Sequence, residues 1–253
     1  MNWLGAADGT LVPVALAATA SGGALLRLAG RPGWTSRQRA SLAGALALTV
    51  VVLAGPLEWL GEERLMSAHM VQHLLAFSAI PALLLAGTPR DVLLRVEQHP
   101  AWRWIARPSG AAIAAAIGVV VIWGAHVPPV LDGALERPPL TDLGHLALIA
   151  VGVVWLWPIV GPSRLRGFRA LGYLAVTDLL IGVLGIWLAW YPSLVYDTYQ
   201  AVPPTLGIDA ENDQALAGGI LLVVAEPFLA IEVVRLFLRA LSDSDEDEET
   251  DAA

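Results

Sequence analysis

Long uninterrupted apolar stretches constrain the fold of this chain more than any other feature. Several of them reach the roughly 20 residues that an α-helix needs to cross about 30 Å of hydrocarbon. Of the 253 residues, 56% are hydrophobic and 15% are charged, whereas about 25% are charged in an average soluble domain. Because lipid cannot satisfy backbone polar groups, such stretches must form helices. We therefore predict an all-α, polytopic membrane protein and exclude a soluble enzyme.

The apolar stretches predict seven transmembrane helices. Their expected bounds are Thr10–Leu28, Ser41–Leu60, His69–Gly87, Ala111–Leu131, Asp142–Val160, Leu171–Tyr191 and Gln214–Leu236. Thirteen arginines fall on one side of these helices, and only Arg64 and Arg137 fall on the other. Since cytoplasmic loops carry the excess of basic residues, the N-terminus is predicted outside and the C-terminus in the cytoplasm. The expected location is a prokaryotic plasma membrane.

The domain organisation is predicted to be simple. Residues 1–241 should form one seven-helix transmembrane domain, and residues 242–253 (SDSDEDEETDAA) a disordered acidic cytoplasmic tail, because a run of like charges cannot pack. Two amino acids are missing from the sequence. Without Cys there are no thiolate copper sites or iron–sulfur clusters, and without Lys there is no Schiff base to retinal or pyridoxal phosphate.

Four of the five histidines are predicted near the outer ends of helices. His69 and His73 open the third span, His126 lies near the outer end of the fourth, and His145 begins the fifth. His69 and His73 are four residues apart and therefore share one face of a helix. Imidazole is a ligand for zinc, copper, iron and nickel. The structural alternative is that each ring lies at the headgroup level, where an amphipathic side chain is comfortable.

Methionine near the histidine pair favours copper, because thioethers select Cu(I) and no thiol is present. Met66 lies three residues before His69, whereas Met70 follows it directly and should face elsewhere. We therefore expect Met66 to be the better-placed thioether. Carboxylates predicted on the same side could bind or orient the site: Glu58, Glu62, Asp132, Asp142, Asp197 and Asp213.

Four short motifs resemble those of a known family. The run 68–75 (AHMVQHLL), followed by Pro81 and Gly87-Thr88-Pro89, resembles the third-span signature of the CtaG-like cytochrome c oxidase assembly proteins. Further similar motifs follow in family order: WGAHVP at 123–128, His145 ahead of Gly152 and WLWP at 155–158, and Asp213-Gln214 ahead of Ala217-Gly218. One departure is Gly144, which stands where an acidic residue commonly precedes the span-five histidine.

The resemblance implies seven spans and a role in supplying copper to haem–copper oxidases during their assembly. By resemblance, the characteristic outer-face positions of the family are His69, His73, His126, His145 and Asp213. Together with Met66, these residues are the predicted metal site. The expected function is a Cu(I)-binding assembly factor, not an enzyme, that passes copper to an oxidase subunit or to a copper chaperone. The chain is also expected to contact the lipid bilayer, and no nucleic acid is expected as a partner. Whether it forms a homo-oligomer is left open.

Two other functions are alternatives for this pattern of residues. The main alternative is a membrane b-type haem or quinone-linked redox protein, in which His73 and either His126 or His145 would be axial ligands. A transporter would use Asp178 and Glu226, two acids predicted inside the membrane. The residues between these acids and the outer histidines are nearly all apolar, which argues against a continuous polar path.

Overall fold

The computed structural model describes residues 34–200, 202–223, 226–235 and 237–238. Within these residues every regular element is a helix, and the one β-type contact is an isolated bridge between Thr205 and Ile208. The prediction of an all-helical protein is therefore confirmed for the described part. The first predicted span, Thr10–Leu28, and the acidic tail at 242–253 lie outside the described residues.

Four described helices are long and apolar enough to cross a membrane: Met66–Gly87, Pro138–Val160, Phe168–Trp190 and Ala210–Arg235. Two bent helix pairs raise the number to six if each pair counts as one span. These helices support a membrane protein. The number seven and the orientation of the termini stay predictions.

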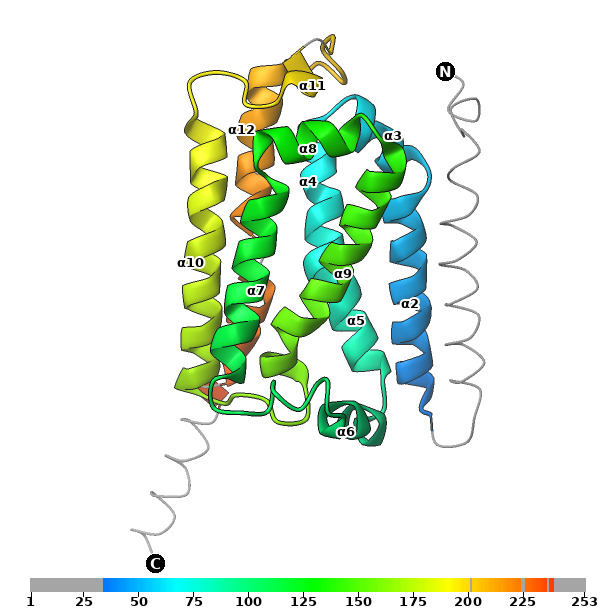
Figure 1. Ribbon diagram of the computed structural model, residues 1–253, viewed down its shortest axis with the longest axis vertical. Coiled ribbons are helices and arrows are strands. Elements are labelled where there is room, and N and C mark those ends of the chain that lie inside the picture. Colours follow the sequence, from blue (N-terminus) through cyan, green and yellow to red (C-terminus); the bar gives the residue numbers. More distant parts are fainter. Residues whose placement is uncertain (1–33, 201, 224–225, 236, 239–253) are drawn as a thin grey trace, which may run out of the picture.

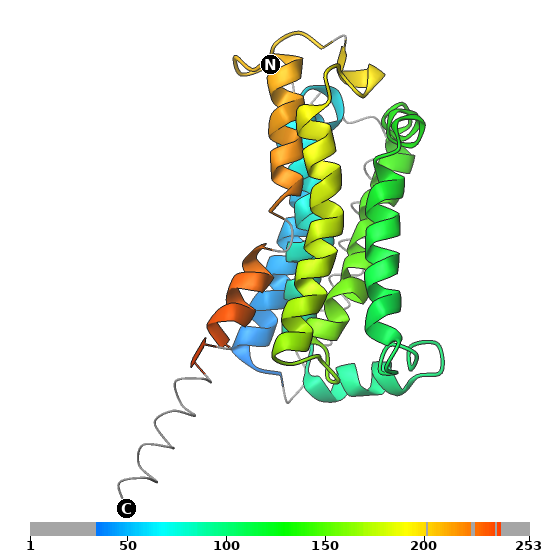
Figure 2. The ribbon, with the colours of Figure 1, turned by 90° about the vertical axis from the view of Figure 1, so that its left-hand side faces the viewer.

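The helices form a bundle with two distinct ends (Figure 1). Its elements are α2 (Ser36–Leu53), α3 (Pro56–Glu63), α4 (Met66–Leu74), the π-helical η1 (Leu75–Ala79), α5 (Ile80–Gly87), α6 (Arg90–Gln98), α7 (Gly110–Ala125), α8 (Pro128–Leu135), α9 (Pro138–Val160), α10 (Phe168–Trp190), α11 (Asp197–Gln200) and α12 (Ala210–Leu221). Helices α3, α8 and α11 lie at one end, called here the α8 end. Helix α6 lies at the other, the α6 end, in both views (Figures 1 and 2).

The continuous helix α4–η1–α5 occupies the centre of the bundle. It packs against α2, α3, α9 and α12, while α7 packs against α9 and α10, and α10 lies beside α12. In the central helix, 56% of the most apolar stretch is buried, compared with 39% of the corresponding stretch in α10. Side chains that project from α4 are therefore surrounded by other helices.

Two predicted spans are broken by proline. The span predicted as Ser41–Leu60 consists of α2 and α3, which are bent by 41°. Gly55 has a φ of +107°, which suits glycine, and Pro56 then begins α3. The span predicted as Ala111–Leu131 consists of α7 and α8, bent by 67°. Pro128 disfavours helical backbone at Val127, so α7 ends before this residue, at Ala125, and α8 lies across the end of the bundle (Figure 1).

A proline also explains the π-helical turn in the central helix. Pro81 has no N–H to donate to the carbonyl of Phe77, four residues earlier, and its ring would clash with that carbonyl in a regular helix. The chain widens to a π-helix over Leu75–Ala79. The Phe77 carbonyl oxygen lies only 2.2 Å from where a Cβ on Gly152 would be. Glycine at 152 is therefore required for α9 to pack this closely against the central helix.

Candidate metal centre

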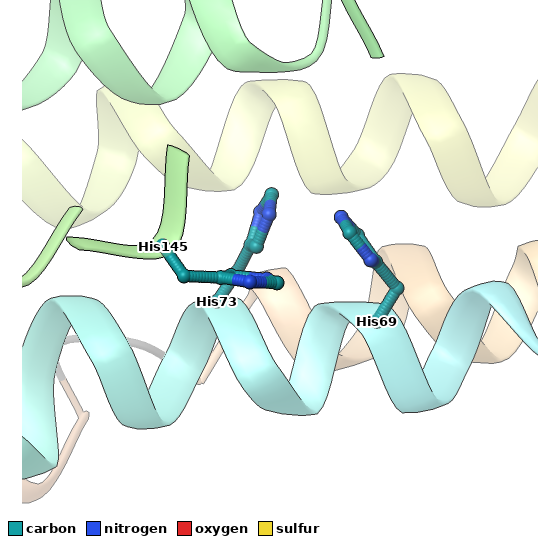
Figure 3. A group of neighbouring side chains, drawn as sticks. All are labelled: His69, His73 and His145. Carbon is teal, nitrogen blue, oxygen red and sulfur yellow. The ribbon is translucent and has the colours of Figure 1, made fainter. Parts of the chain in front are cut away.

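Three of the predicted histidines converge at one point inside the bundle. His69 and His73 project from α4 and His145 from α9, and their rings face one another (Figure 3). One ring nitrogen of each lies within 4.8 Å of the corresponding nitrogens of the other two. The ring centroids of His69 and His73 are 4.4 Å apart, and those of His73 and His145 are 5.4 Å apart. Two elements far apart in sequence thus supply one group of nitrogen donors.

The nitrogens of this group are buried and short of partners. His69 and His145 are each 1% exposed, and neither ring nitrogen of either residue has a hydrogen-bond partner among the described residues. Leaving a buried polar group unsatisfied costs about 1–3 kcal/mol. Neutral imidazoles that face one another in this way gain partners when they bind a metal ion between them.

His126 contacts the group indirectly, through His73. The Nδ1 of His126 lies 2.6 Å from the carbonyl oxygen of Ile122, so this nitrogen carries the proton and donates it. The Nε2 of His126 is then an acceptor, and it lies 3.3 Å from Nδ1 of His73. His73 donates from Nδ1 and keeps the lone pair on Nε2 for a metal ion. This is the geometry of a residue that orients a metal ligand.

The segment after α10 holds His126 in place. Tyr196 donates a hydrogen bond of 2.9 Å from its hydroxyl to the backbone carbonyl of His126. Burial, reinforced by Asp132, raises the pKa of Tyr196, so the phenol stays protonated and remains a donor. Thr198 in turn donates to Asp132 of α8 from its N–H and its hydroxyl. The segment that contains α11 is thereby fastened over the α8 end.

Met70 places a thioether beside one of the histidines. The sulfur of Met70 lies 3.1 Å from Nε2 of His126. We expected Met66 because Met70 directly follows His69, but Met70 is also three residues before His73, and residues at that spacing share a helix face. The spacing to His73 was the signal that sequence reasoning missed. Met66 is buried, 2% exposed, at the first residue of α4.

The carboxylate of Asp213 lies at the N-terminus of α4 and is not part of the three-histidine group. Helix α4 has no capping side chain of its own at Leu65. Asp213, from the first turn of α12, accepts hydrogen bonds from the N–H of Met66 at 2.6 Å and of Ser67 at 3.2 Å, and from the Ser67 hydroxyl. A negative charge at a helix N-terminus is stabilising. Asp213 therefore fixes the start of the helix that carries His69 and His73.

A cavity of about 440 Å³ adjoins the three histidines. Its walls include Ala125, Pro129, Arg137 and Thr141, so it extends between α7, α8 and α9 toward the α8 end. The three histidine rings are buried, and this cavity gives access to them. Neither Asp178 nor Glu226 is among the described residues that line it.

These features define a class: a helical, membrane-spanning protein with a buried three-histidine centre near one end of its bundle. The family model described as "Cytochrome c oxidase caa3 assembly factor (Caa3_CtaG)" matches residues 21–243. The chain belongs to this family, which confirms the resemblance found in its motifs. Comparisons with curated proteins and with solved structures give no match.

Proposed function

We propose that this caa3 oxidase assembly factor binds copper, favoured as Cu(I), at His69, His73 and His145 and delivers it to a haem–copper oxidase subunit. The observation that carries the proposal is the convergence of three buried imidazoles whose nitrogens lie within 4.8 Å of one another. Copper is one of the metals that imidazole suits, and the Met70 thioether beside His126 favours Cu(I) among them.

The outer face of the membrane is proposed for this site. The segments rich in arginine, residues 88–109 and 161–169, lie at the α6 end, opposite the histidines. Cytoplasmic segments carry the excess of Lys and Arg, so the α6 end is assigned to the cytoplasm and the α8 end to the outside. This assignment places the cavity toward the compartment in which an oxidase subunit or a copper chaperone would exchange the metal.

Delivery requires a site that releases its ion. Three nitrogen ligands leave a coordination position for an incoming donor, as in catalytic zinc sites with three protein ligands. An incoming imidazole or sulfur ligand would bind copper through the cavity before a histidine of this protein leaves. The copper keeps its oxidation state, and no substrate is converted, so the proposed role involves binding and exchange without turnover.

The same geometry argues against the haem alternative. Two axial histidines need a porphyrin plane between them. His73 is in hydrogen-bond contact with His126, which leaves no space for that plane. A porphyrin between His73 and His145 would meet the ring of His69. The centroid of this ring lies 4.4 Å from that of His73 and 5.3 Å from that of His145, so the His69 ring would have to be displaced.

The proposal is tested by anaerobic Cu(I) loading of the detergent-purified protein, followed by metal analysis and visible absorbance. About one copper per chain is expected, with no Soret band. The double variant His69→Ala/His73→Ala should lose the copper. His99→Ala is the matched control, because His99 is exposed beyond α6, and it should bind like the unaltered protein. Equal copper in the unaltered protein and the double variant, or a Soret band without copper, would overturn the proposal.

A further inference from the structure

Three carboxyl groups form a second cluster beside the histidines. Glu58 and Glu62 come from α3 and Asp142 from α9, and one oxygen of each lies within 4.8 Å of those of the other two. Glu58 is 7% exposed and Asp142 is 3% exposed. From their positions in the sequence, these acids were expected only to bind or orient the histidine site. The structure collects them into a separate group.

This cluster lacks the partners that buried carboxylates require. One oxygen of Glu62 and one of Asp142 are buried without a hydrogen-bond partner among the described residues. Neither ion pair in the described part of the chain includes any of the three acids. Glu58 accepts one hydrogen bond, of 3.2 Å, from the N–H of Gly55. Neighbouring carboxylates repel one another when ionised, so the group needs protons or a cation to be stable.

A fourth oxygen, from an uncharged side chain on another helix, points to the cation. The amide nitrogen of Gln72 donates a 2.7 Å hydrogen bond to the carbonyl of Val52, which determines the orientation of the amide. Its oxygen is buried and has no partner among the described residues, and Gln72 is 0% exposed. A neutral amide oxygen does not relieve carboxylate repulsion, but it is a good ligand for a hard cation.

The amide oxygen of Gln72 lies against α3, the helix that carries Glu58 and Glu62. It lies 2.1 Å from where a Cβ on Gly61 would be. Gly61 is three residues after Glu58, so the two positions share one face of α3, and the oxygen lies against that face. Any larger residue at 61 would displace it. The glycine thus leaves room for an oxygen donor that no group in the described part of the chain uses.

We propose that Glu58, Glu62 and Asp142, with the amide oxygen of Gln72, form an oxygen-ligand site for a hard divalent cation of the Ca²⁺ or Mn²⁺ type. Carboxylate and amide oxygens suit these ions and do not suit Cu(I). A dication neutralises two of the three negative charges, and the unpartnered oxygens become its ligands. The site is distinct from the three-histidine group, which has only nitrogen donors.

The two sites share structural elements. Asp142 and His145 are one turn apart on α9, and Gln72 directly precedes His73 on α4. The backbone of His69 lies 3.0 Å from the Cβ position of Gly61, so α3 packs on α4 beside the first histidine. A cation held between α3 and α9 would therefore fix the spacing of the helices that carry the nitrogen ligands.

Mn²⁺ is a suitable probe because its electron paramagnetic resonance spectrum distinguishes free from bound ions. Titration of the copper-free, detergent-purified protein should show about one bound Mn²⁺ per chain, displaced by excess Ca²⁺ if both ions use the site. The double variant Glu62→Gln/Asp142→Asn preserves side-chain shape and should weaken Mn²⁺ binding at least tenfold. Glu63→Gln is the matched control, since Glu63 is exposed on the same helix, and it should bind Mn²⁺ unchanged.

The histidine variant separates this inference from the proposed function. His69→Ala/His73→Ala should retain Mn²⁺, whether or not the unaltered protein binds copper. Absence of bound Mn²⁺ in the unaltered protein, unchanged Mn²⁺ binding in Glu62→Gln/Asp142→Asn, or loss of Mn²⁺ in the histidine variant would each overturn the inference. If the double acid variant does not fold, the single variant Glu58→Gln is measured against Glu63→Gln under the same criteria.

Discussion

The Nε2 of His126 accepts a hydrogen bond from His73, at 3.3 Å, and does not join the three-histidine group. Its own Nδ1 donates to the carbonyl of Ile122 one turn earlier in α7, so the tautomers of both rings are determined by hydrogen bonding. His126 is thus a positioning residue, and its loss should have a different effect from the loss of a metal ligand.

His126→Ala is expected to keep one copper per chain and to bind it 10- to 100-fold more weakly, as is typical when a residue that orients a ligand is removed. Competition with a Cu(I) chelator measures this affinity. His145→Ala should instead lower the stoichiometry. Equal losses of stoichiometry in the two variants would show that His126 is itself a ligand.

Asp213→Asn should destabilise the protein by about 0.3–1 kcal/mol, because it removes the negative charge at the N-terminus of α4. The expected consequence is a lower thermal unfolding temperature by circular dichroism. Copper stoichiometry should not change, since the carboxylate is engaged by Met66 and Ser67. If the variant lost copper while its unfolding temperature stayed the same, Asp213 would be a ligand rather than a cap.

Gly152→Ala should be destabilising by about 1–3 kcal/mol, the usual cost of overpacking a core. The added Cβ would lie 2.2 Å from the Phe77 carbonyl oxygen, so α9 would have to move away from the central helix. Gly144→Ala on the same helix is the control, because no described atom outside its chain neighbours and the nearby backbone of α9 lies within 4 Å of its Cβ position. Chemical denaturation in detergent compares the two. Similar stability of both variants would contradict the close contact at Gly152.

Tyr196→Phe should cost about 0.5–1.5 kcal/mol through the lost hydrogen bond to the His126 carbonyl. Burial raises the pKa of Tyr196 above its ordinary value, so the folded protein holds the phenol proton more tightly than the unfolded chain does. The contribution of Tyr196 is therefore fully present below about pH 10 and falls as the pH rises further. The difference in unfolding temperature between Tyr196→Phe and the unaltered protein should stay constant from neutral pH to about pH 9. A difference that shrinks within that range would contradict the raised pKa.

The fold class followed from composition and apolar length, because the need to satisfy backbone groups in lipid leaves helices as the only solution for such stretches. The angles of the bends at Gly55-Pro56 and Pro128 were less predictable from the sequence. Proline and glycine mark a break, but the angle and the direction of α3 and α8 depend on what each helix packs against. The same is true of the π-helical turn around Pro81, which is coupled to Gly152 on a different helix.

The sequence by itself determined that the protein is helical and apolar enough for a membrane, that it belongs to the caa3 assembly factor family, and that His69 and His73 share one helix face. These properties depend on local spacing and on apolar content, which the order of residues specifies directly. Only the tertiary structure decided that His145 completes the group, that His126 and Met70 flank it, and that Asp213 caps α4. It also collected Glu58, Glu62 and Asp142 into one cluster. The physical reason is that these contacts join helices distant in sequence, and their rotation and depth are set by packing across the whole bundle.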